Sequence, residues 1–133
     1  MYELRESFIP FFLVGLGAIF GSLLRLYLST YFGLIISYKY VGTFLVNIIA
    51  SFSLGFILAL LNHSGLDSLQ NQSGLFLLIC AGFLGSLSTF STFIIDLLDI
   101  LLAKRYKFFA YFSILSVVGG LSAGALGLYF GYV

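Results

Sequence analysis

The stretch Gly82–Phe93 reads GFLGSLSTFSTF and lies inside an uncharged run from Leu75 to Ile95. A run of about 20 such residues is long enough to cross a bilayer as a helix. Its centre nevertheless holds small and polar residues, which are Gly82, Gly85, Ser86, Ser88, Thr89, Ser91 and Thr92. Because an unpaired polar group is costly in hydrocarbon, such residues usually face protein or a water-accessible cavity. The stretch therefore predicts the lining of a polar path through a membrane.

The whole chain has the composition of an integral membrane protein. Of its 133 residues, 61% are hydrophobic and 8% are charged, and the formal net charge is +1. So few charges could not cover a water-soluble domain of this size. The near-neutral charge gives no reason to expect a nucleic acid or an acidic partner. Cys80 is the only cysteine, and a single thiol within a span is expected to serve packing.

Four segments are long and apolar enough to span a membrane as helices. We place them at residues 9–30, 41–61, 75–102 and 108–131, within a single domain that comprises residues 1–133. Their apolar runs are continuous, whereas the strands of a membrane β-barrel would alternate apolar and polar residues. The predicted fold class is therefore an all-α integral membrane protein with four transmembrane helices. Residues 62–74 form the one clearly polar connection.

Each expected helix carries small or polar residues at a spacing of three or four, which places them on one face. These seams are Gly17, Gly21, Arg25 and Ser29; Thr43, Asn47, Ser51 and Gly55; Thr89, Thr92 and Asp96; and Ser113, Ser116, Gly120, Gly124 and Gly127. Small residues let membrane helices approach closely, so the glycines alone predict helix packing. Convergence of all the seams on one polar interior indicates a pathway as well.

Two side chains in the first two spans are candidates for function. Arg25 lies toward the far end of the first span, where reaching lipid headgroups is an equally good explanation. Asn47 lies about two turns inside the second span, at 5.4 Å per turn, too deep for its amide to reach water easily. A hydrogen bond between helices would satisfy this amide. Its NH2 group could also donate to an anion.

Phe90 and Phe93 are three residues apart and share one helix face. Packing or lipid contact is the common role of phenylalanine in a membrane helix. The edge of a phenyl ring is, however, electropositive. An edge-on ring could therefore contact an anion without the full charge that would trap it.

The chain resembles the Fluc/CrcB family of fluoride channels over essentially its whole length. The motifs that carry the resemblance are GLGAIFGSLLRLYL at Gly15–Leu28, GTFLVNIIAS at Gly42–Ser51 and GFLGSLSTFSTF at Gly82–Phe93, and SVVGGLSAGALGL at Ser116–Leu128 is similar to the family's last helix. The resemblance implies a channel in the cell membrane that passively exports fluoride and lowers its cytoplasmic concentration. It also implies an antiparallel dimer with fluoride pores at the interface.

The resemblance further assigns roles to individual residues. The pore would be lined by Asn47, Phe90, Phe93, Thr89, Thr92 and Ser116, with Arg25 at a vestibule. The third helix would be broken between residues 82 and 89, and backbone carbonyl groups of Gly85 and Ser88 would bind a structural sodium ion that is not transported. This chain departs from the family's usual residues at Ser88, Asp96 and Gly120, where threonine, glutamate and, in some members, serine stand.

Two other functions stay open at this level. A small multidrug-type exporter also has four helices, but it needs a titratable carboxylate deep in the first span, where this chain has Arg25 instead. A non-transporting assembly subunit would explain the glycine seams but not Asn47. An enzyme is not expected, because His63 is the sole histidine and no catalytic triad or metal-ligand spacing is visible.

The charges of the connections predict an orientation. Lys39, Lys104, Arg105 and Lys107 fall on one side of the expected bundle, whereas only Arg5 falls on the other. The positive-inside rule therefore favours both termini outside. The family resemblance implies that the chain pairs with itself. Because a homodimer of opposed copies should show little charge bias, the bias predicts a homologue of the opposite orientation as the alternative partner.

Overall fold

The computed structural model describes residues 2–35, 39–63 and 74–133. Its helices are α1 (Tyr2–Ile35), α2 (Lys39–His63), α4 (Gly74–Phe76), the π-helix η1 (Leu77–Leu84), α5 (Gly85–Leu87), α6 (Phe90–Leu102) and α7 (Tyr106–Tyr132). Four helical segments are long and apolar enough to cross a membrane, at Phe8–Ile35, Tyr40–Asn62, Leu77–Leu102 and Tyr106–Tyr132. The predicted all-α class with four such helices is thus confirmed. Residues 64–73, most of the expected polar connection, lie outside the described residues.

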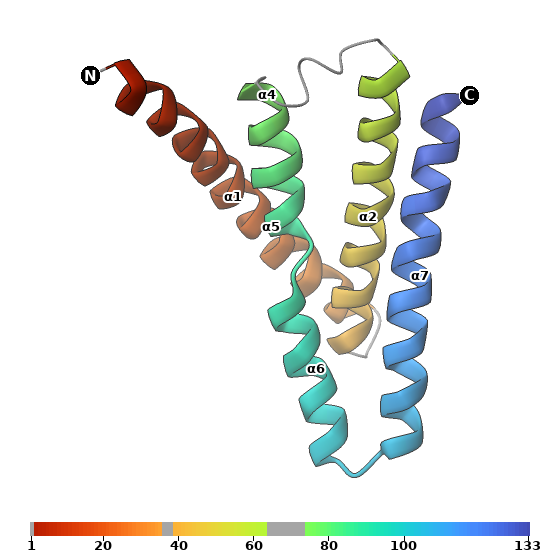
Figure 1. Ribbon diagram of the computed structural model, residues 1–133. Coiled ribbons are helices and arrows are strands. Elements are labelled where there is room, and N and C mark those ends of the chain that lie inside the picture. The colour runs from red at the N-terminus through yellow and green to blue at the C-terminus, as the bar shows by residue number, and fades with distance from the viewer. Residues whose placement is uncertain (1, 36–38, 64–73) are drawn as a thin grey trace.

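The helices form an open bundle in which α2 and α7 run side by side (Figure 1). The third span is a chain of helical pieces, α4, η1, α5 and α6, and α1 lies obliquely across its upper half. Both termini lie at one end of the bundle, and the turn between α6 and α7 lies at the other. The start of α2, at Lys39, lies toward the same end as that turn, which is the side of the bundle that the sequence predicts for it.

The third span is interrupted at Ser88 and Thr89. Ser88 has φ −80° and ψ 120°, and Thr89 has φ −129° and ψ 132°, so both residues are extended. The expected break is therefore present, but it is shorter than the predicted 82–89 because Gly82 to Leu87 remain helical. A second departure from regular α-helix, the π-helix Leu77–Leu84, precedes the break.

Gly17 and Gly82 allow α1 to cross the part before the break at close range. A Cβ atom added at Gly17 would overlap the carbonyl oxygen of Leu78 and lie 2.9 Å from the amide nitrogen of Phe83. One added at Gly82 would lie 3.0 Å from Cα of Gly17. Backbone therefore packs directly on backbone where α1 crosses η1. Glycine is what allows membrane helices to approach this closely.

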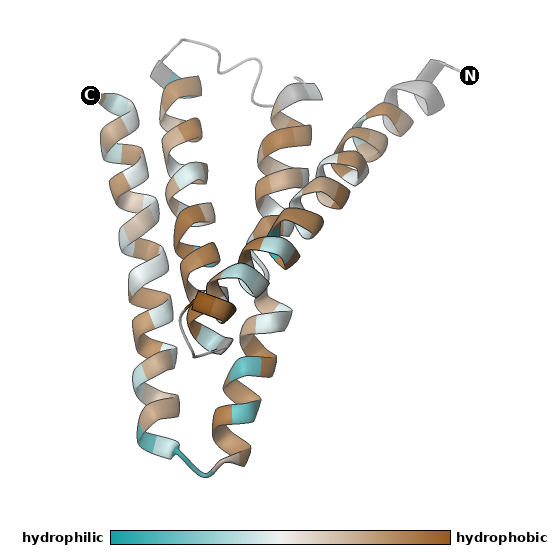
Figure 2. Ribbon diagram, turned by 180° about the vertical axis from the view of Figure 1, so that it is seen from behind, coloured by the Kyte–Doolittle hydropathy of each residue, from teal (hydrophilic) through white to brown (hydrophobic). Residues whose placement is uncertain are grey.

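Two clusters of buried apolar side chains hold the remaining helices together. One joins α2 to the end of η1 and to α5, and it comprises Val46, Ala50, Leu84 and Leu87. The other joins α6 to α7, and it comprises Leu97, Ile100 and Phe112. Apolar residues also cover most of the outward faces, while the α6–α7 turn is hydrophilic (Figure 2). Outward apolar faces with polar ends match a bilayer environment.

Candidate functional site around Asn47

The side chain of Asn47 is bonded to the break in the third span. The backbone N–H of Thr89 donates to Oδ1 of Asn47 at an N···O distance of 3.2 Å. In a continuous helix this N–H would instead donate to the carbonyl oxygen of Gly85. The interhelical bond expected for an asparagine at this depth is therefore present, and its partner is main chain rather than a side chain.

Two hollows meet at Asn47. The first, here called the phenylalanine hollow, consists of adjoining spaces of about 150 and 320 Å³ that share the linings Asn47, Phe90, Phe93, Ser116 and Val117. The second, here called the arginine hollow, has a volume of about 70 Å³ and is lined by Arg25, Leu26, Ser29, Thr43, Val46, Asn47 and Thr92. A water molecule occupies about 30 Å³ of liquid. The arginine hollow is thus the size of a few waters.

Asn47 is, among the described residues, the one that lines both hollows. The structure thereby gathers the predicted pore residues Asn47, Phe90, Phe93 and Ser116 around one space, with Thr89 at its wider part. It places Arg25 and Thr92 on the other side of the amide. The seam residues that line a hollow thus divide into two groups rather than forming one uniform lining.

The two phenylalanine rings differ in how they are held. Their centroids lie 6.1 Å apart with planes tilted by 50°. Phe93 also packs on Phe112, with centroids 6.1 Å apart, and belongs to the apolar contacts of the α6–α7 cluster. Phe90 is 74% exposed. Phe93 is therefore anchored in the chain, whereas Phe90 extends from it.

Two buried hydroxyl groups face these hollows without a hydrogen-bond partner among the described residues. They are Oγ of Ser116, beside the phenylalanine hollow, and Oγ1 of Thr92, beside the arginine hollow. A buried hydroxyl without a partner is costly, so such groups indicate a place where water or another ligand binds. Ser113, in the same seam as Ser116, instead donates to the carbonyl oxygen of Phe109 at 2.8 Å.

Gly85 and Ser88, the predicted sodium ligands, flank the short helix that ends at the break. Gly85 is the exposed first residue of α5, and Ser88 is its half-buried C-cap. The last carbonyl groups of a helix lack intrahelical donors, and the donor that Gly85 would have used is bonded to Asn47. Carbonyl oxygens at this point therefore can bind a cation. No cluster of three or more His, Cys, Asp or Glu side chains exists in the described part of the chain.

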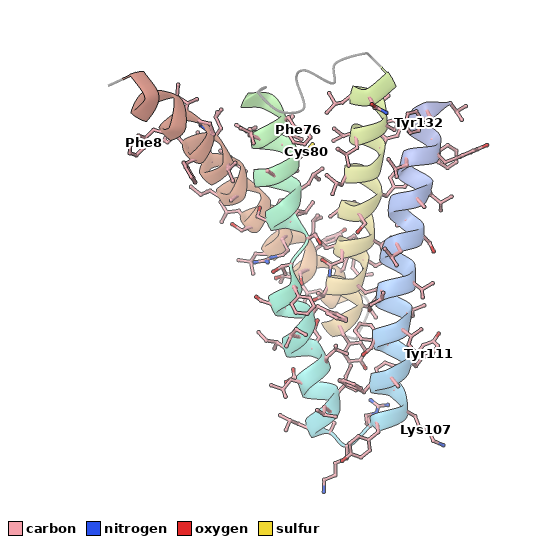
Figure 3. The ribbon with its side chains drawn as sticks, viewed as in Figure 1. Phe8, Phe76, Cys80, Lys107, Tyr111 and Tyr132 are labelled. Atoms are coloured by element: carbon pink, nitrogen blue, oxygen red, sulfur yellow. The ribbon has the colours of Figure 1, made fainter. Side chains whose placement is uncertain are left out.

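Several site features were not predicted from the sequence. Phe44, Ile48 and Val117 form apolar walls of the phenylalanine hollow, and nothing distinguishes them from other apolar residues of a membrane helix. Thr43 is 7% exposed and Asp96 is 3% exposed, and both belong to predicted seams. Cys80 is buried (5% exposed) and lies in the upper half of the third span (Figure 3), lining neither hollow. Its predicted packing role agrees with this position.

Comparison with known sequences decides the family. The family described as "CrcB-like protein, Camphor Resistance (CrcB)" matches residues 12–128 of this chain. The chain belongs to this CrcB family. The match runs from the first span to near the end of the fourth, so it includes Asn47 and the whole GFLGSLSTFSTF stretch. Together with the four helices that can cross a bilayer, it identifies a multi-pass membrane protein.

Curated CrcB relatives carry the names of ion channels. A protein of Synechococcus sp. (strain CC9902) named "Fluoride-specific ion channel FluC 1" is 48% identical over 75 residues, which is 56% of each chain. The FluC 1 protein of Parasynechococcus marenigrum is 45% identical over 75 residues, again 56% of each chain. A "Fluoride-specific ion channel FluC 2" of Prochlorococcus marinus is 36% identical over 86 residues, which is 65% of this chain and 64% of the relative. The chain thus matches the first two relatives over about half of their length.

Proposed function

We propose that this chain forms a fluoride-selective channel that passively exports fluoride and so lowers its cytoplasmic concentration. The observation that carries the proposal is the Asn47 amide, which lies between two hollows while its oxygen is bonded to Thr89. Because Oδ1 of Asn47 already accepts a hydrogen bond, the amide offers only its N–H donors to a ligand. N–H donors bind anions in preference to cations. The names of the CrcB relatives specify which anion to test.

Passage of fluoride requires groups that replace its water one by one. The Asn47 N–H groups, the unpaired hydroxyls of Ser116 and Thr92, and the positive ring edges of Phe90 and Phe93 supply such groups. No charged side chain lines the phenylalanine hollow among the described residues. Weak neutral donors suit conduction, because an ion must bind firmly enough to lose water and loosely enough to leave. Arg25 attracts anions into the arginine hollow.

A second chain is proposed to cover the phenylalanine hollow. Besides apolar residues, its wider part is lined by Asn47, Ser51, Ser88, Thr89 and Ser116, and the hollow opens on the surface of the single chain beside the exposed Phe90. Polar groups at membrane depth face protein or water rather than lipid. The partner is a second copy or a homologue of opposite orientation, as the family resemblance implies.

Sodium at the centre of that dimer fits the carbonyl groups of Gly85 and Ser88. Both residues lie at the broken helix, where the carbonyl of Gly85 has lost its helical donor to Asn47. Oxygen ligands suit a hard cation, and broken membrane helices bind sodium through unwound carbonyls. Two such breaks facing each other would provide more oxygens than one chain offers. The bound cation would supply positive charge beside the anion path.

The test is fluoride efflux from liposomes, followed with a fluoride electrode. To supply both orientations, the chain is co-expressed with a copy in which Lys104, Arg105 and Lys107 are changed to glutamine and extra lysines precede the N-terminus. Liposomes with this balanced preparation should release fluoride and retain chloride in a parallel assay. Release of both ions, or of neither, would contradict the proposal. A proton-coupled exporter is distinguished by a dependence of transport on a pH gradient.

A further inference from the structure

We infer that the break in the third span orients the Asn47 amide and thereby makes it a donor to the ion. The inference rests on the proposed function. In it, the main chain of Thr89 is a positioning group that acts through Asn47. Its basis is the hydrogen bond from Thr89 N–H to Asn47 Oδ1, at 3.2 Å, together with the hollows on both sides of the amide.

The chemistry of this bond fixes which end of the amide faces Thr89. A backbone N–H can only donate, and of the two amide atoms of Asn47 only Oδ1 can accept. The NH2 group is thus held away from Thr89. The Asn47 side chain makes no other hydrogen bond to the described residues. Both N–H donors are therefore available to a ligand in the hollows.

The break is what makes Thr89 N–H available. Ser88 N–H still donates to the carbonyl oxygen of Leu84, at 3.1 Å, as in a regular helix. The next residue, Thr89, is extended and forms the N-cap of α6. Its N–H lacks a helical acceptor and would be unsatisfied in a membrane without Asn47. Asn47 Oδ1 thus provides the acceptor that Thr89 N–H lacks, and Thr89 N–H provides a donor for the Asn47 oxygen.

The Asn47 amide has two N–H groups, and two hollows adjoin it. Asn47 lies between the phenylalanine hollow, with the unpaired Ser116 hydroxyl, and the arginine hollow, with the unpaired Thr92 hydroxyl. We assign one N–H of the amide to each hollow. An ion that leaves the Ser116 hydroxyl then meets an Asn47 N–H before it reaches the Thr92 hydroxyl. If the amide were free to rotate by 180° about its terminal bond, its oxygen would face the path for part of the time and repel the anion. Orientation by Thr89 prevents this.

The experiment removes the Thr89 N–H without removing any side chain. The balanced preparation is made with the α-hydroxy analogue of threonine at position 89, which replaces the N–H by an ester oxygen. The matched control places the α-hydroxy analogue of alanine at Ala103, whose N–H donates to the Asp99 carbonyl at 3.1 Å at the far end of α6. Each ester thus removes one hydrogen bond that a backbone N–H donates, at N···O distances of 3.2 Å for Thr89 and 3.1 Å for Ala103. Flux per active channel and the fraction of liposomes that contain an active channel are measured separately.

Orientation by Thr89 predicts a fall of about twofold or more in flux per channel for the ester at 89, because without the hydrogen bond the two orientations of the amide become equally populated and the ester oxygen repels Oδ1. The ester at 103 should alter at most the fraction of active liposomes, because it affects stability alone. Because an ester also weakens the carbonyl of Ser88, the assay is repeated at high sodium. Recovery of flux at high sodium, or equal flux per channel in both esters and the unmodified protein, would overturn the inference. Absence of fluoride flux in the unmodified preparation would instead refute the proposed function.

Discussion

At the scale of single residues, Asn47 combines a feature that sequence could predict with one that it could not. Its depth in the second span predicts a hydrogen-bond partner or a role in transport, and the structure shows the bond. The partner could not be predicted, because a backbone N–H is present at every residue except proline and becomes a donor to a side chain only where a helix breaks. Ser116 and Ser113 show the same limit: they lie in one predicted seam, yet only Ser113 is satisfied by its own helix.

Changing Asn47 to aspartate should abolish fluoride flux. The carboxylate can still accept from Thr89 N–H, but it has lost both donors and carries a negative charge. Repulsion between two unit charges about 4 Å apart is about 4 kcal/mol at an effective dielectric constant of 20, roughly a thousandfold in rate. The same change at Asn62, which donates to the hydroxyl of Tyr132 at 2.6 Å, is the control and should leave fluoride efflux intact. Substantial flux through N47D would refute the donor role.

Changing Phe90 to isoleucine tests the contribution of a ring edge. Because Phe90 is 74% exposed in the chain, its loss should not disturb the packing of α6. We expect flux to fall roughly tenfold, which corresponds to about 1.4 kcal/mol, while the elution volume of the protein in size-exclusion chromatography stays that of the unmodified protein. Phe52→Ile serves as the control, since Phe52 stacks on Phe56 away from both hollows. Equal flux in both variants would count against a role for the ring.

At the scale of elements, the third span shows how far the sequence reaches. The family resemblance implies an interruption between residues 82 and 89, and Ser88 and Thr89 are indeed extended. The π-helix Leu77–Leu84 was not predicted. No local signal marks it, because its apolar residues fit an α-helix equally well. It includes Gly82, where the third span meets Gly17 of α1.

The helix crossing can be tested with two alanine substitutions in α1. At Gly17 the added methyl group would overlap the carbonyl oxygen of Leu78, whereas at Gly15 nothing lies within 4 Å. Overpacking typically costs about 1–3 kcal/mol, so Gly17→Ala should lower the thermal unfolding temperature in detergent. Gly15→Ala should be neutral or slightly stabilising, since alanine favours helix. A similar decrease in both variants would mean that α1 does not cross η1 in this way.

At the scale of the whole molecule, the sequence predicted four helices that can span a membrane, and the described residues contain them. The hydrophilic α6–α7 turn lies at the end opposite both termini. Lys107 projects outward near that turn (Figure 3). What a single sequence cannot give is the surface that another chain covers, because lipid-facing and protein-facing apolar residues look alike in composition. The polar lining of the phenylalanine hollow, on which the proposed covering by a second chain rests, becomes visible only once the helices are assembled.

The charge bias predicts an outcome for the chain expressed alone. If the positive-inside rule orients every copy with its termini outside, opposed pairs are rare and fluoride flux should be weak. Co-expression with the copy that has reversed charges should raise flux at least severalfold at equal protein. Labelling of a cysteine placed in the α6–α7 turn reports the orientation independently. Full flux from the chain alone would show that it pairs with itself despite the bias.

Fluoride is proposed to pass through the hollow beside Asn47, and chemical modification of Ser116, which lines that hollow, tests this path. Ser116→Cys is introduced together with Cys80→Ala and reacted with a small methanethiosulfonate reagent, with Ala103→Cys in the exposed turn as the control. We predict that reaction at position 116 blocks fluoride efflux and that reaction at position 103 does not. Undiminished efflux after complete reaction at position 116, verified by mass spectrometry, would contradict the account.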